Sequence, residues 1–354
     1  MAVTVVHVLG VLDRGGAETV ALDLCRAIPA TDVRQRFLTL GDREGLLAPR
    51  FRAAGATVDR CPIHPAVTFV PRLWWWLRTS RPDVVTSHVS LVSGVVLAVA
   101  AAAGVRVRIA RLHSEGDGRP DTVARRVRRA LLRAVLRRAA TAVLGVTSAA
   151  LGFAGPPPGD RRYRVVPNGV DTRRFPLAHR SGDAPVFVHI GRAAPEKNRG
   201  FLLGVHAEAR RSRPGTRLVL AGPGGVADLG PAAGSDPSVS LLGETERVAE
   251  VLAGASVLVL PSHREGLPGA VLEALAVGVP VLATDLPGLR ELAGQVRGLT
   301  VLPLAAGARA WATTALDLAS APPAERGEIS AAIGRSPFSL DRSADTWRRL
   351  WTVR

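Results

Sequence analysis

The sequence is poor in cysteine and lysine, and aromatic residues make up only 4% of it. Its two cysteines, Cys25 and Cys61, are too few for a disulfide framework or a cysteine-held metal cluster, and a reducing compartment fits them. The longest apolar stretch, Val89–Val105, is shorter than the ~20 residues that a membrane-spanning helix needs. The first residues lack the basic stretch of a signal peptide, so we interpret Val3–Leu9 as a buried strand. We therefore expect a globular, cytoplasmic protein.

What the sequence does contain is a repeated alternation of short apolar runs and helical patterns. A chain of 354 residues is too long for one comfortable core, and its 47% hydrophobic and 21% charged residues are typical of a globular protein. The alternation predicts an α/β fold of two Rossmann-like, doubly wound domains that face a central cleft. A stretch rich in glycine and proline, Gly152–Pro176, is the expected connection. We place the domains at residues 1–172 and 173–335, with a C-terminal helix in 336–354 that packs back on the first domain.

The net charge of +16 lies almost entirely in the first half of the chain. Residues 1–180 hold 28 basic and 13 acidic residues, whereas residues 181–354 hold 18 and 17. This asymmetry indicates an anionic partner for the first domain, such as a membrane surface, an acidic substrate or a nucleic acid. No nucleic-acid-binding module is recognisable, so we do not expect a nucleic-acid partner.

A basic helix expected at Thr122–Arg138 concentrates this charge and has no acidic residue after Asp121. Its helical spacing puts Arg125, Arg129, Arg133 and Arg137 on one face, with Val127, Leu131 and Val135 roughly opposite. Elsewhere in the domain, three consecutive tryptophans lie between two arginines. One interpretation is peripheral contact with anionic lipid through Arg125–Arg138, on the inner face of the cell membrane. The alternative is a solvated basic face, with the tryptophans packed inside the domain. The three tryptophans are Trp74, Trp75 and Trp76, and the two arginines that flank them are Arg72 and Arg78.

Two strand-to-helix turns could bind an anion. In the first, Gly15 and Gly16 let backbone amides approach a ligand at a helix N-terminus, although neither a dinucleotide fingerprint nor a P-loop is present there. The second turn contains Arg192 and Lys197, the only lysine in the chain. Two cations beyond a strand end can clamp a diphosphate. A solvated loop is the alternative for the second turn, and an ordinary strand-to-helix turn, many of which contain two glycines, is the alternative for the first.

The segment Pro261–Leu275 is the most informative. A strand ends at Pro261 and a helix is expected from about Gly269, so the backbone amides of Gly269, Ala270 and Val271 form another candidate anion site. Two carboxylates, Glu265 and Glu273, lie eight residues apart and could contact different parts of one elongated ligand. Carboxylates accept hydrogen bonds from hydroxyl groups, as sugar recognition requires. The alternative is a solvated loop acid and an exposed helix residue.

Glu265 to Glu273 resembles the E-x7-E signature of the retaining family-4 glycosyltransferases, which have the GT-B fold. The departure from that pattern is Leu267-Pro-Gly in place of an aromatic-glycine pair. Further matches follow in family order along nearly the whole chain: Gly-Gly-Ala-Glu at 15–18, Val-Pro-Asn-Gly-Val-Asp at 166–171, Gly-Arg…Glu-Lys-Asn at 191–198 and Pro-Val-Leu-Ala-Thr-Asp at 280–285.

The resemblance implies a role for each candidate residue. Glu273 would bind the ribose hydroxyls and Glu265 the sugar hydroxyls, while Arg192 and Lys197 would hold the diphosphate. The amides of Gly269, Ala270 and Val271 would complete the clamp, with Gly15 and Gly16 closing over it. His113 matches the family's cleft histidine near the transferred sugar, and His88 is a second candidate. Further possible contacts are Asn168, and Leu242 and Glu244 near the nucleotide base.

The implied activity is retaining transfer of a hexosyl or N-acetylhexosaminyl group from a nucleotide-sugar. UDP is favoured as the nucleotide, and the acceptor is a hydroxyl of a glycan, a lipid-linked sugar or a natural product. We expect no cofactor and no metal, because no Asp-x-Asp motif is present and two cations can stabilise the leaving diphosphate. The alternatives are a GDP-mannose-dependent mannosyltransferase, and a basic nucleic-acid- or membrane-binding protein without catalysis. The last would leave Glu265 and Glu273 unexplained.

Overall fold

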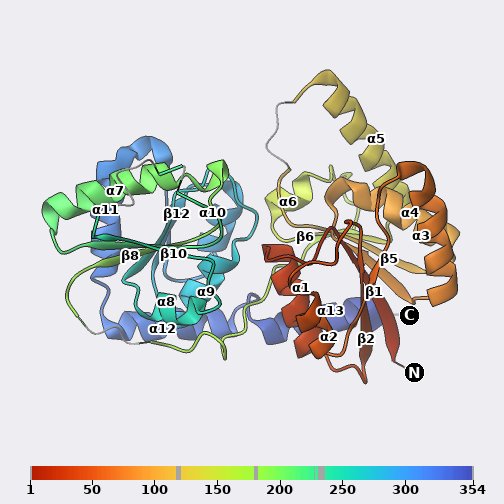
Figure 1. Cartoon of the computed structure of the whole chain (residues 1–354), viewed down its shortest axis with the longest axis horizontal. Helices are drawn as coiled ribbons and strands as arrows, with labels where there is room; N and C mark the ends of the chain where they lie inside the picture. Colours follow the sequence, from red (N-terminus) through yellow and green to blue (C-terminus); the bar gives the residue numbers. More distant parts are fainter. Residues whose placement is uncertain (1, 117–120, 179–181, 227, 230–235, 353–354) are drawn as a thin grey trace. The chain divides into compact units, whose positions relative to one another are not determined.

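The computed structural model describes residues 2–116, 121–178, 182–226, 228–229 and 236–352. The chain divides into two compact units, each with one parallel sheet covered by helices (Figure 1). Unit 1 comprises Met1–Gly169 and Leu340–Arg354, and unit 2 comprises Val170–Ser339. The boundaries placed from the sequence, at 172 and 335, lie a few residues from these. Within the described residues, no helix is both long and apolar enough to span a membrane.

The sheet of unit 1 has seven strands in the order β3-β2-β1-β4-β5-β6-β7. Alternating residues of its strands point to opposite faces, so that Val5 and Val84 join one core cluster and Val6 and Val85 join another. The first face is covered by α1 and α13, and the second by α3, α4 and α5. The elements are β1 Val3–Leu9, α1 Gly16–Ala27, β2 Val33–Thr39, α2 Ala48–Ala53, β3 Thr57–Arg60, α3 Ala66–Ser80, β4 Val84–Ser87, α4 Ser93–Ala102, β5 Val107–Leu112, α5 Val123–Ala139, β6 Ala142–Gly145, α6 Ser148–Gly152, β7 Tyr163–Val165 and α13 Leu340–Thr352.

The sheet of unit 2 has six strands in the order β10-β9-β8-β11-β12-β13. Its central strand β11 is buried throughout, as expected for a parallel sheet with both faces covered. The elements are β8 Val186–Ile190, α7 Arg199–Ser212, β9 Arg217–Ala221, β10 Val239–Gly243, α8 Val248–Ala253, β11 Val257–Leu260, α9 Gly269–Val277, β12 Val281–Thr284, α10 Pro287–Ala293, β13 Leu299–Leu302, α11 Gly307–Ala319 and α12 Pro323–Arg335.

Both sheets reverse their strand order at one point, and this determines where ligands can bind. In unit 1 the reversal lies between β1 and β4, and in unit 2 between β8 and β11. Open α/β sheets bind ligands beyond the carboxyl ends of the strands at such a point, because the two following loops diverge there and leave a crevice. The turns that the sequence singled out follow β1, β8 and β11.

Several elements differ from the sequence-based expectation. The connection expected at 152–176 contains β7, whose three residues pair in parallel with β6. The three tryptophans lie on α3, which begins at Ala66 and includes Pro71 in its second turn. The basic helix expected at Thr122–Arg138 is confirmed as α5, with Thr122 as its N-cap.

The direction in which α5 faces corrects the solvated-basic-face interpretation for two of its arginines. Leu136 and Ala139 are buried, and Arg129 and Arg133 lie on that inward side, partly buried against the ring of Phe153. The Arg133 guanidinium donates to the Phe153 carbonyl through Nε (3.0 Å) and Nη2 (2.8 Å). The side that carries Val127, Leu131 and Val135 is therefore the one that faces outward.

The tryptophan cluster is likewise not fully packed inside the domain. Trp74 and Trp75 are 40% and 66% exposed, whereas Trp76 is partly buried and stacks under the Arg36 guanidinium. The expectation that all three tryptophans pack in the first domain is therefore wrong for two of them.

Candidate functional site

The loop after β8 in unit 2 brings a lysine and a glutamate together. The Lys197 ammonium donates to Oε1 of Glu265 at 2.6 Å, and the two side chains are only 17% and 8% exposed. An ion pair removed this far from water is held in a fixed geometry, because each charge would be costly to bury without the other. Glu265 is thus not a solvated loop acid, and the side chain of Lys197 is held in place by this contact.

Arg192 does not share this position. Its guanidinium donates to Oε1 of Glu196 at 2.6 Å, and its side chain is 67% exposed. An exposed ion pair of this kind contributes little to stability, so Arg192 can leave Glu196 and bind another anion. The two cations predicted to hold a diphosphate therefore differ: Lys197 is fixed and partly buried, and Arg192 is on the surface of the same turn.

Backbone contacts hold the loops at this edge of the sheet against one another. The His263 amide, after β11, donates to the Glu196 carbonyl, after β8, at 2.8 Å. Gly222, after β9, has a φ of 142°, and a Cβ there would lie 2.1 Å from the Gly191 carbonyl oxygen. Only glycine fits that close approach. The position of Lys197 is therefore set by the turns after three neighbouring strands.

The N-terminus of α9 lies in the loop that carries Glu265. Its N-cap is Pro268, which offers no side-chain acceptor, so the first amides of the helix have no cap. A Cβ added at Gly269 would lie 3.9 Å from Oε1 of Glu273, which shows that this carboxylate reaches back to the first turn. Gly269, Ala270 and Glu273 are all partly exposed.

Val271 is the exception among the predicted amide donors. Its amide donates to the Pro268 carbonyl at 3.2 Å, and its side chain is fully buried. The prediction that its amide takes part in an anion site is therefore not supported, since that hydrogen bond is already made. The available donors of this helix end are Gly269 and Ala270.

A buried histidine that the sequence reasoning missed lies beneath the same turn. His189 lies in the apolar strand β8. Its Nδ1 donates a hydrogen bond to the Val259 carbonyl oxygen at 3.0 Å, because a carbonyl oxygen can only accept. Its Nε2 is buried without a hydrogen-bond partner among the described residues, and a Cβ at Gly191 would approach that atom to 3.1 Å. Burial, followed by the nearby charge of Lys197, lowers the pKa of His189 to about 4. A lone polar residue inside an apolar strand was the available signal.

Leu242 and Glu244, predicted near the nucleotide base, lie at the end of the edge strand β10. Leu242 is 47% exposed, and Glu244 is exposed as well. Between them, the Gly243 carbonyl accepts a hydrogen bond from the Gly222 amide at 2.8 Å. This contact connects the end of β10 to the turns around Lys197.

Three histidines form a hydrogen-bonded chain at the carboxyl ends of the strands of unit 1. His7 Nδ1 lies 3.1 Å from His88 Nε2, and His88 Nδ1 lies 3.0 Å from His113 Nε2. Neighbouring rings are stacked, with centroids 5.4 and 5.3 Å apart. The structure thus brings both predicted histidines together and adds His7, which comes from the apolar run of β1 and was missed.

The three rings are neutral at ordinary pH. Burial, and after it the charge of Arg111, lowers the pKa of His7 to about 3, and burial also places the pKa values of His88 and His113 well below their usual range. Each N···N contact needs one proton, so the three tautomers are coupled. The nearby side chain of Gln35 opposes the lowering of the His7 pKa, although His7 Nε2 and Gln35 Oε1 are both buried without a hydrogen-bond partner among the described residues.

Asn168, a predicted ligand contact, is hydrogen-bonded to a buried residue of unit 1. Its Oδ1 accepts a hydrogen bond of 2.5 Å from Nη2 of Arg111, and both residues are buried. The Arg111 guanidinium also lies 4.4 Å from the ring of Trp347 in α13, and burial lowers the pKa of Arg111 to about 9. Asn168 therefore satisfies a buried cation beside the histidine chain.

The glycine turn after β1 is partly occupied by its own helix. A Cβ at Gly15 would lie 2.3 Å from Oε2 of Glu18, so this carboxylate covers the N-cap of α1. Burial raises the pKa of Glu18. Gly16 is exposed, and a Cβ there would meet nothing within 4 Å. An anion could approach at Gly16, but at Gly15 it would compete with Glu18.

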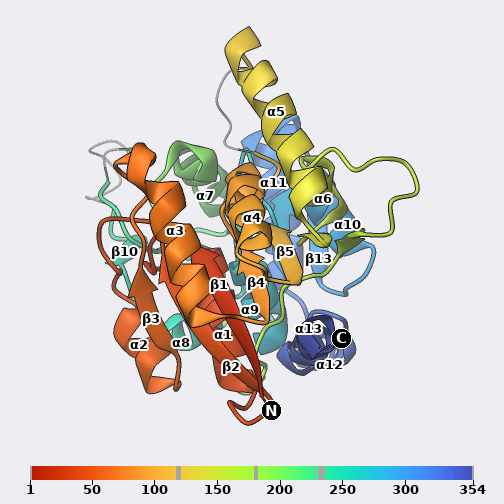
Figure 2. The same cartoon turned by 90° about the vertical axis from the view of Figure 1, so that its right-hand side faces the viewer.

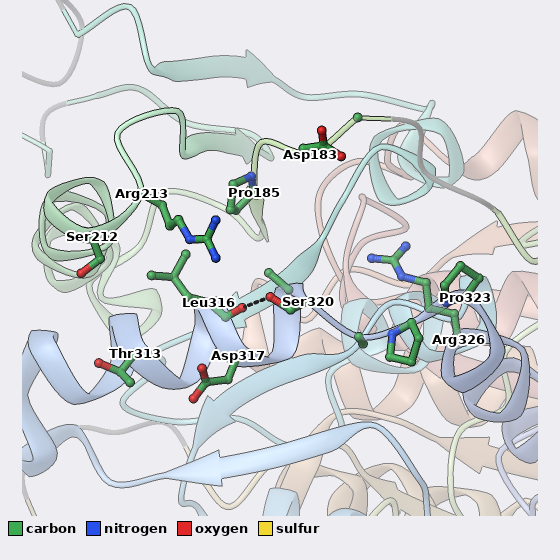
Figure 3. A pocket seen from close by; sticks show the side chains of 14 residues that line it. Asp183, Pro185, Ser212, Arg213, Thr313, Leu316, Asp317, Ser320, Pro323 and Arg326 are labelled. Atoms are coloured by element: carbon green, nitrogen blue, oxygen red, sulfur yellow. Dashed lines mark hydrogen bonds between the residues drawn. The ribbon is translucent and has the colours of Figure 1, made fainter.

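A cavity of about 570 Å³ lies elsewhere in unit 2 (Figure 3). Pro185, which precedes β8, and Arg213, which follows α7, are among the residues that line it. It is thus at the amino-terminal ends of the strands, and none of the predicted site residues lines it. The described residues also contain no group of three or more His, Cys, Asp or Glu side chains placed to hold a metal ion.

Comparison with known proteins identifies the family. The profile described as "Glycosyl transferases group 1" matches residues 184–320, and that of a "Glycosyl transferase 4-like domain" matches residues 15–169. The putative glycosyltransferase EpsF of Bacillus subtilis is 26% identical, over 99% of this chain and 96% of its own. The capsular polysaccharide biosynthesis glycosyltransferase CapH of Staphylococcus aureus is 24% identical, over 77% of this chain and 78% of its own.

Solved structures show the same fold. HepE of Anabaena, solved in complex with UDP and glucose, superposes with a TM-score of 0.77 at 16% sequence identity, covering 97% of each chain. The two profiles together span most of the chain, in the order of the two units. These matches agree with the two Rossmann-like units and with the candidate ligand groups at their strand ends. The chain is therefore a nucleotide-sugar-dependent glycosyltransferase of the group 1 type, family 4, with the GT-B fold.

Proposed function

We propose that this glycosyltransferase moves a hexosyl or N-acetylhexosaminyl group from a UDP-sugar to a glycan, lipid-linked or natural-product hydroxyl, with retention of configuration. The observation that carries the proposal is the partly buried contact between Lys197 and Glu265 beside the first turn of α9. The UDP and glucose in the solved complex of HepE support the choice of donor, and the name of CapH supports a glycan acceptor.

In this proposal, Lys197 neutralises the charge that develops on the leaving diphosphate. A cation stabilises a leaving group most when it is held in place before the reaction, because no reorganisation is then needed in the transition state. Glu265 supplies that fixed position through its 2.6 Å contact, and its second carboxylate oxygen is the acceptor for a sugar hydroxyl. The Gly269 and Ala270 amides and the exposed Arg192 add donors for the phosphates.

Glu273 is the proposed ribose contact. Its carboxylate lies at the first turn of α9, close to the same amides. A carboxylate can accept hydrogen bonds from two neighbouring hydroxyl groups, which suits the 2′ and 3′ positions of a ribose. The nucleoside would thus be held on one side of the amides and the sugar, through Glu265, on the other.

His113 is the proposed contact of unit 1 with the transferred sugar, and His88 and His7 set its tautomer. With the proton of His7 on Nε2, Nε2 of His88 donates to His7 and Nε2 of His113 donates to His88, which leaves Nδ1 of His113 as an acceptor for a sugar hydroxyl. Because its pKa is lowered, the ring stays neutral and keeps this acceptor role at neutral pH. Metal-independent transfer stays a prediction.

The test is the rate of UDP release from a panel of UDP-sugars by Lys197→Ala and Lys197→Arg. Removing a preorganised charge donor costs about 10²–10³ in turnover, so we expect Lys197→Ala to fall by that factor. Lys197→Arg should recover only part of the rate, because the planar guanidinium cannot place one nitrogen on Glu265 as the ammonium does. Arg247, which forms an exposed ion pair with Glu250 in the same unit, provides the control Arg247→Ala. Equal turnover in Lys197→Ala and this control would refute the role of Lys197.

A further inference from the structure

Helix α5 extends from unit 1, and its N-terminal half is largely unpacked. It has 17 residues, which is about 25 Å of helix, and only Leu136 and Ala139 near its C-terminal end are buried. Figures 1 and 2 show its N-terminal half standing clear of the rest of the unit. A helix gains most of its stability from packing an apolar face, so an outward apolar face needs a partner.

The outward face of α5 carries an aliphatic stripe. Val123, Val127, Leu131 and Val135 follow one another at four-residue spacing and are 65%, 54%, 64% and 37% exposed. Residues with this spacing lie on one face of a helix. The stripe therefore presents a row of branched side chains to solvent along most of the helix.

Arginines border this stripe on both sides. Arg126 and Arg128 each lie about 100° from Val127 around the helix axis, one on either side, and both are exposed. Arg137 and Arg138, at the C-terminal end of the helix, are exposed as well. No acidic residue occurs from 122 to 159. An apolar face with cations along its edges is typical of helices that lie in the interface of an anionic membrane.

A second exposed stripe in the same helical layer has the same chemistry. Helix α3 packs on α4, which also packs on α5, so that the three helices cover one face of the sheet (Figure 2). Val67 of α3 is 84% exposed, and Trp74 and Trp75 are exposed beside Arg78. Tryptophan is enriched where proteins meet the headgroup region of a membrane, because its ring is apolar and its N–H is polar.

The charge pattern disfavours the other occupants. A second copy of α5 would bring arginines against arginines along both edges, and like charges at such positions destabilise helix pairing. A nucleic acid would contact the arginines and leave the aliphatic stripe exposed to water. An anionic lipid surface satisfies both, because acyl chains cover the stripe while phosphate groups pair with the arginines.

We propose that α5 docks unit 1 on an anionic bilayer, with Val123, Val127 and Leu131 inserted below the headgroups and Arg126 and Arg128 bound to lipid phosphates. The proposal differs from the expectation based on the sequence, in which the face of Arg125, Arg129, Arg133 and Arg137 makes the contact. It does not depend on the donor or on the chemistry of transfer.

The test is sedimentation of the full chain with vesicles of phosphatidylcholine containing 30% phosphatidylglycerol, and with phosphatidylcholine alone. We expect binding to the anionic vesicles, weakened by salt. Val127→Ser/Leu131→Ser should lower the partition coefficient at least tenfold, because several buried carbons are lost. Arg126→Gln/Arg128→Gln should lower it by roughly fivefold per arginine on anionic vesicles only.

A matched control is Leu46→Ser/Val165→Ser, which removes two exposed aliphatic side chains of unit 1 away from α5. It should bind as the unchanged protein does. Circular dichroism confirms that each variant is folded. No binding to the anionic vesicles at low salt would overturn the proposal, and so would equal losses in the control and in Val127→Ser/Leu131→Ser. Binding that depends on the arginines but not on Val127 and Leu131 would also overturn it, since insertion is its central element.

A direct readout of insertion is available at Leu131. Both native cysteines, Cys25 and Cys61, are buried, so Leu131→Cys places one exposed thiol for an environment-sensitive fluorophore. The proposal predicts a blue shift of its emission on addition of the anionic vesicles, and the same label at Leu46→Cys should not shift. An unshifted label at position 131 on vesicles that bind the protein would contradict insertion.

Discussion

Acidification should destabilise unit 1 through its buried histidine chain. Folding lowers the pKa of His7 from 6.5 to about 3, mainly because the ring is buried. Between these two pH values the unfolded chain binds a proton at His7 and the folded chain does not. Unfolding therefore takes up a proton, and the free energy of unfolding falls as the pH falls below 6.5. Well above pH 6.5 the ring is neutral in both states, and this penalty is absent.

The size of the effect follows from the two pKa values. Integrating proton uptake at one histidine from pH 7 to pH 5 gives a loss of about 2 kcal/mol. With a urea dependence of ~2 kcal/mol per M, His7 alone lowers the unfolding midpoint by about 1 M. His88 and His113 act in the same direction, because their pKa values are also lowered.

Urea unfolding followed by tryptophan fluorescence measures this loss. Five of the six tryptophans belong to unit 1, and Trp351 lies edge-on to the His7 ring at 5.2 Å. His7→Phe is the informative variant, since it keeps a ring against Phe37 but cannot be protonated. Between pH 7 and pH 5, the free energy of unfolding of this variant should fall by about 2 kcal/mol less than that of the unchanged protein. The same pH dependence in both proteins would refute the assignment of a neutral, buried His7.

Two further predictions concern packing in unit 1. Gly94→Ala should lower the free energy of unfolding by about 1–3 kcal/mol, because the new Cβ would lie 2.9 Å from the backbone nitrogen of Leu136 where α4 meets α5. Gly152→Ala, where a Cβ meets nothing within 4 Å, is its control and should be neutral or stabilising in the same urea titration. Asn168→Ala should cost about 2–3 kcal/mol, because it removes an acceptor from the buried Arg111 guanidinium, and an unchanged midpoint would contradict that role.

The sequence predicted which loops matter because the rule about strand ends is general. Lys197 and Glu265 follow β8 and β11, which are neighbours in the sheet, so their proximity could be expected from the order of strands alone. Their direct contact could not, because it depends on how the two loops pack through His263 and Glu196. The same reason explains why Arg192, five residues before Lys197, ends on the surface with a different partner.

The histidine chain and α5 show what local patterns leave undetermined. His7 stands among valines in a strand, and nothing in its neighbourhood along the chain indicates that it stacks with His88 from another strand. In α5 the helical period separated the arginine face from the aliphatic face correctly. Which of them faces inward depends on tertiary contacts: Leu136 and Ala139 are buried in the core, and the ring and carbonyl of Phe153 contact Arg133.

Calorimetric titration with UDP and with GDP, in the presence of a chelator, tests whether the turns after β8 and β11 bind a nucleotide. We expect UDP to bind more tightly than GDP without a divalent ion. We also expect Glu273→Ala to weaken UDP binding by roughly tenfold, the loss of about 1.4 kcal/mol of hydrogen bonding, with no change in melting temperature. Tighter binding of GDP would contradict the UDP-sugar donor. No binding of either nucleotide, or equal UDP affinity in Glu273→Ala, would contradict a nucleotide site at the turns after β8 and β11.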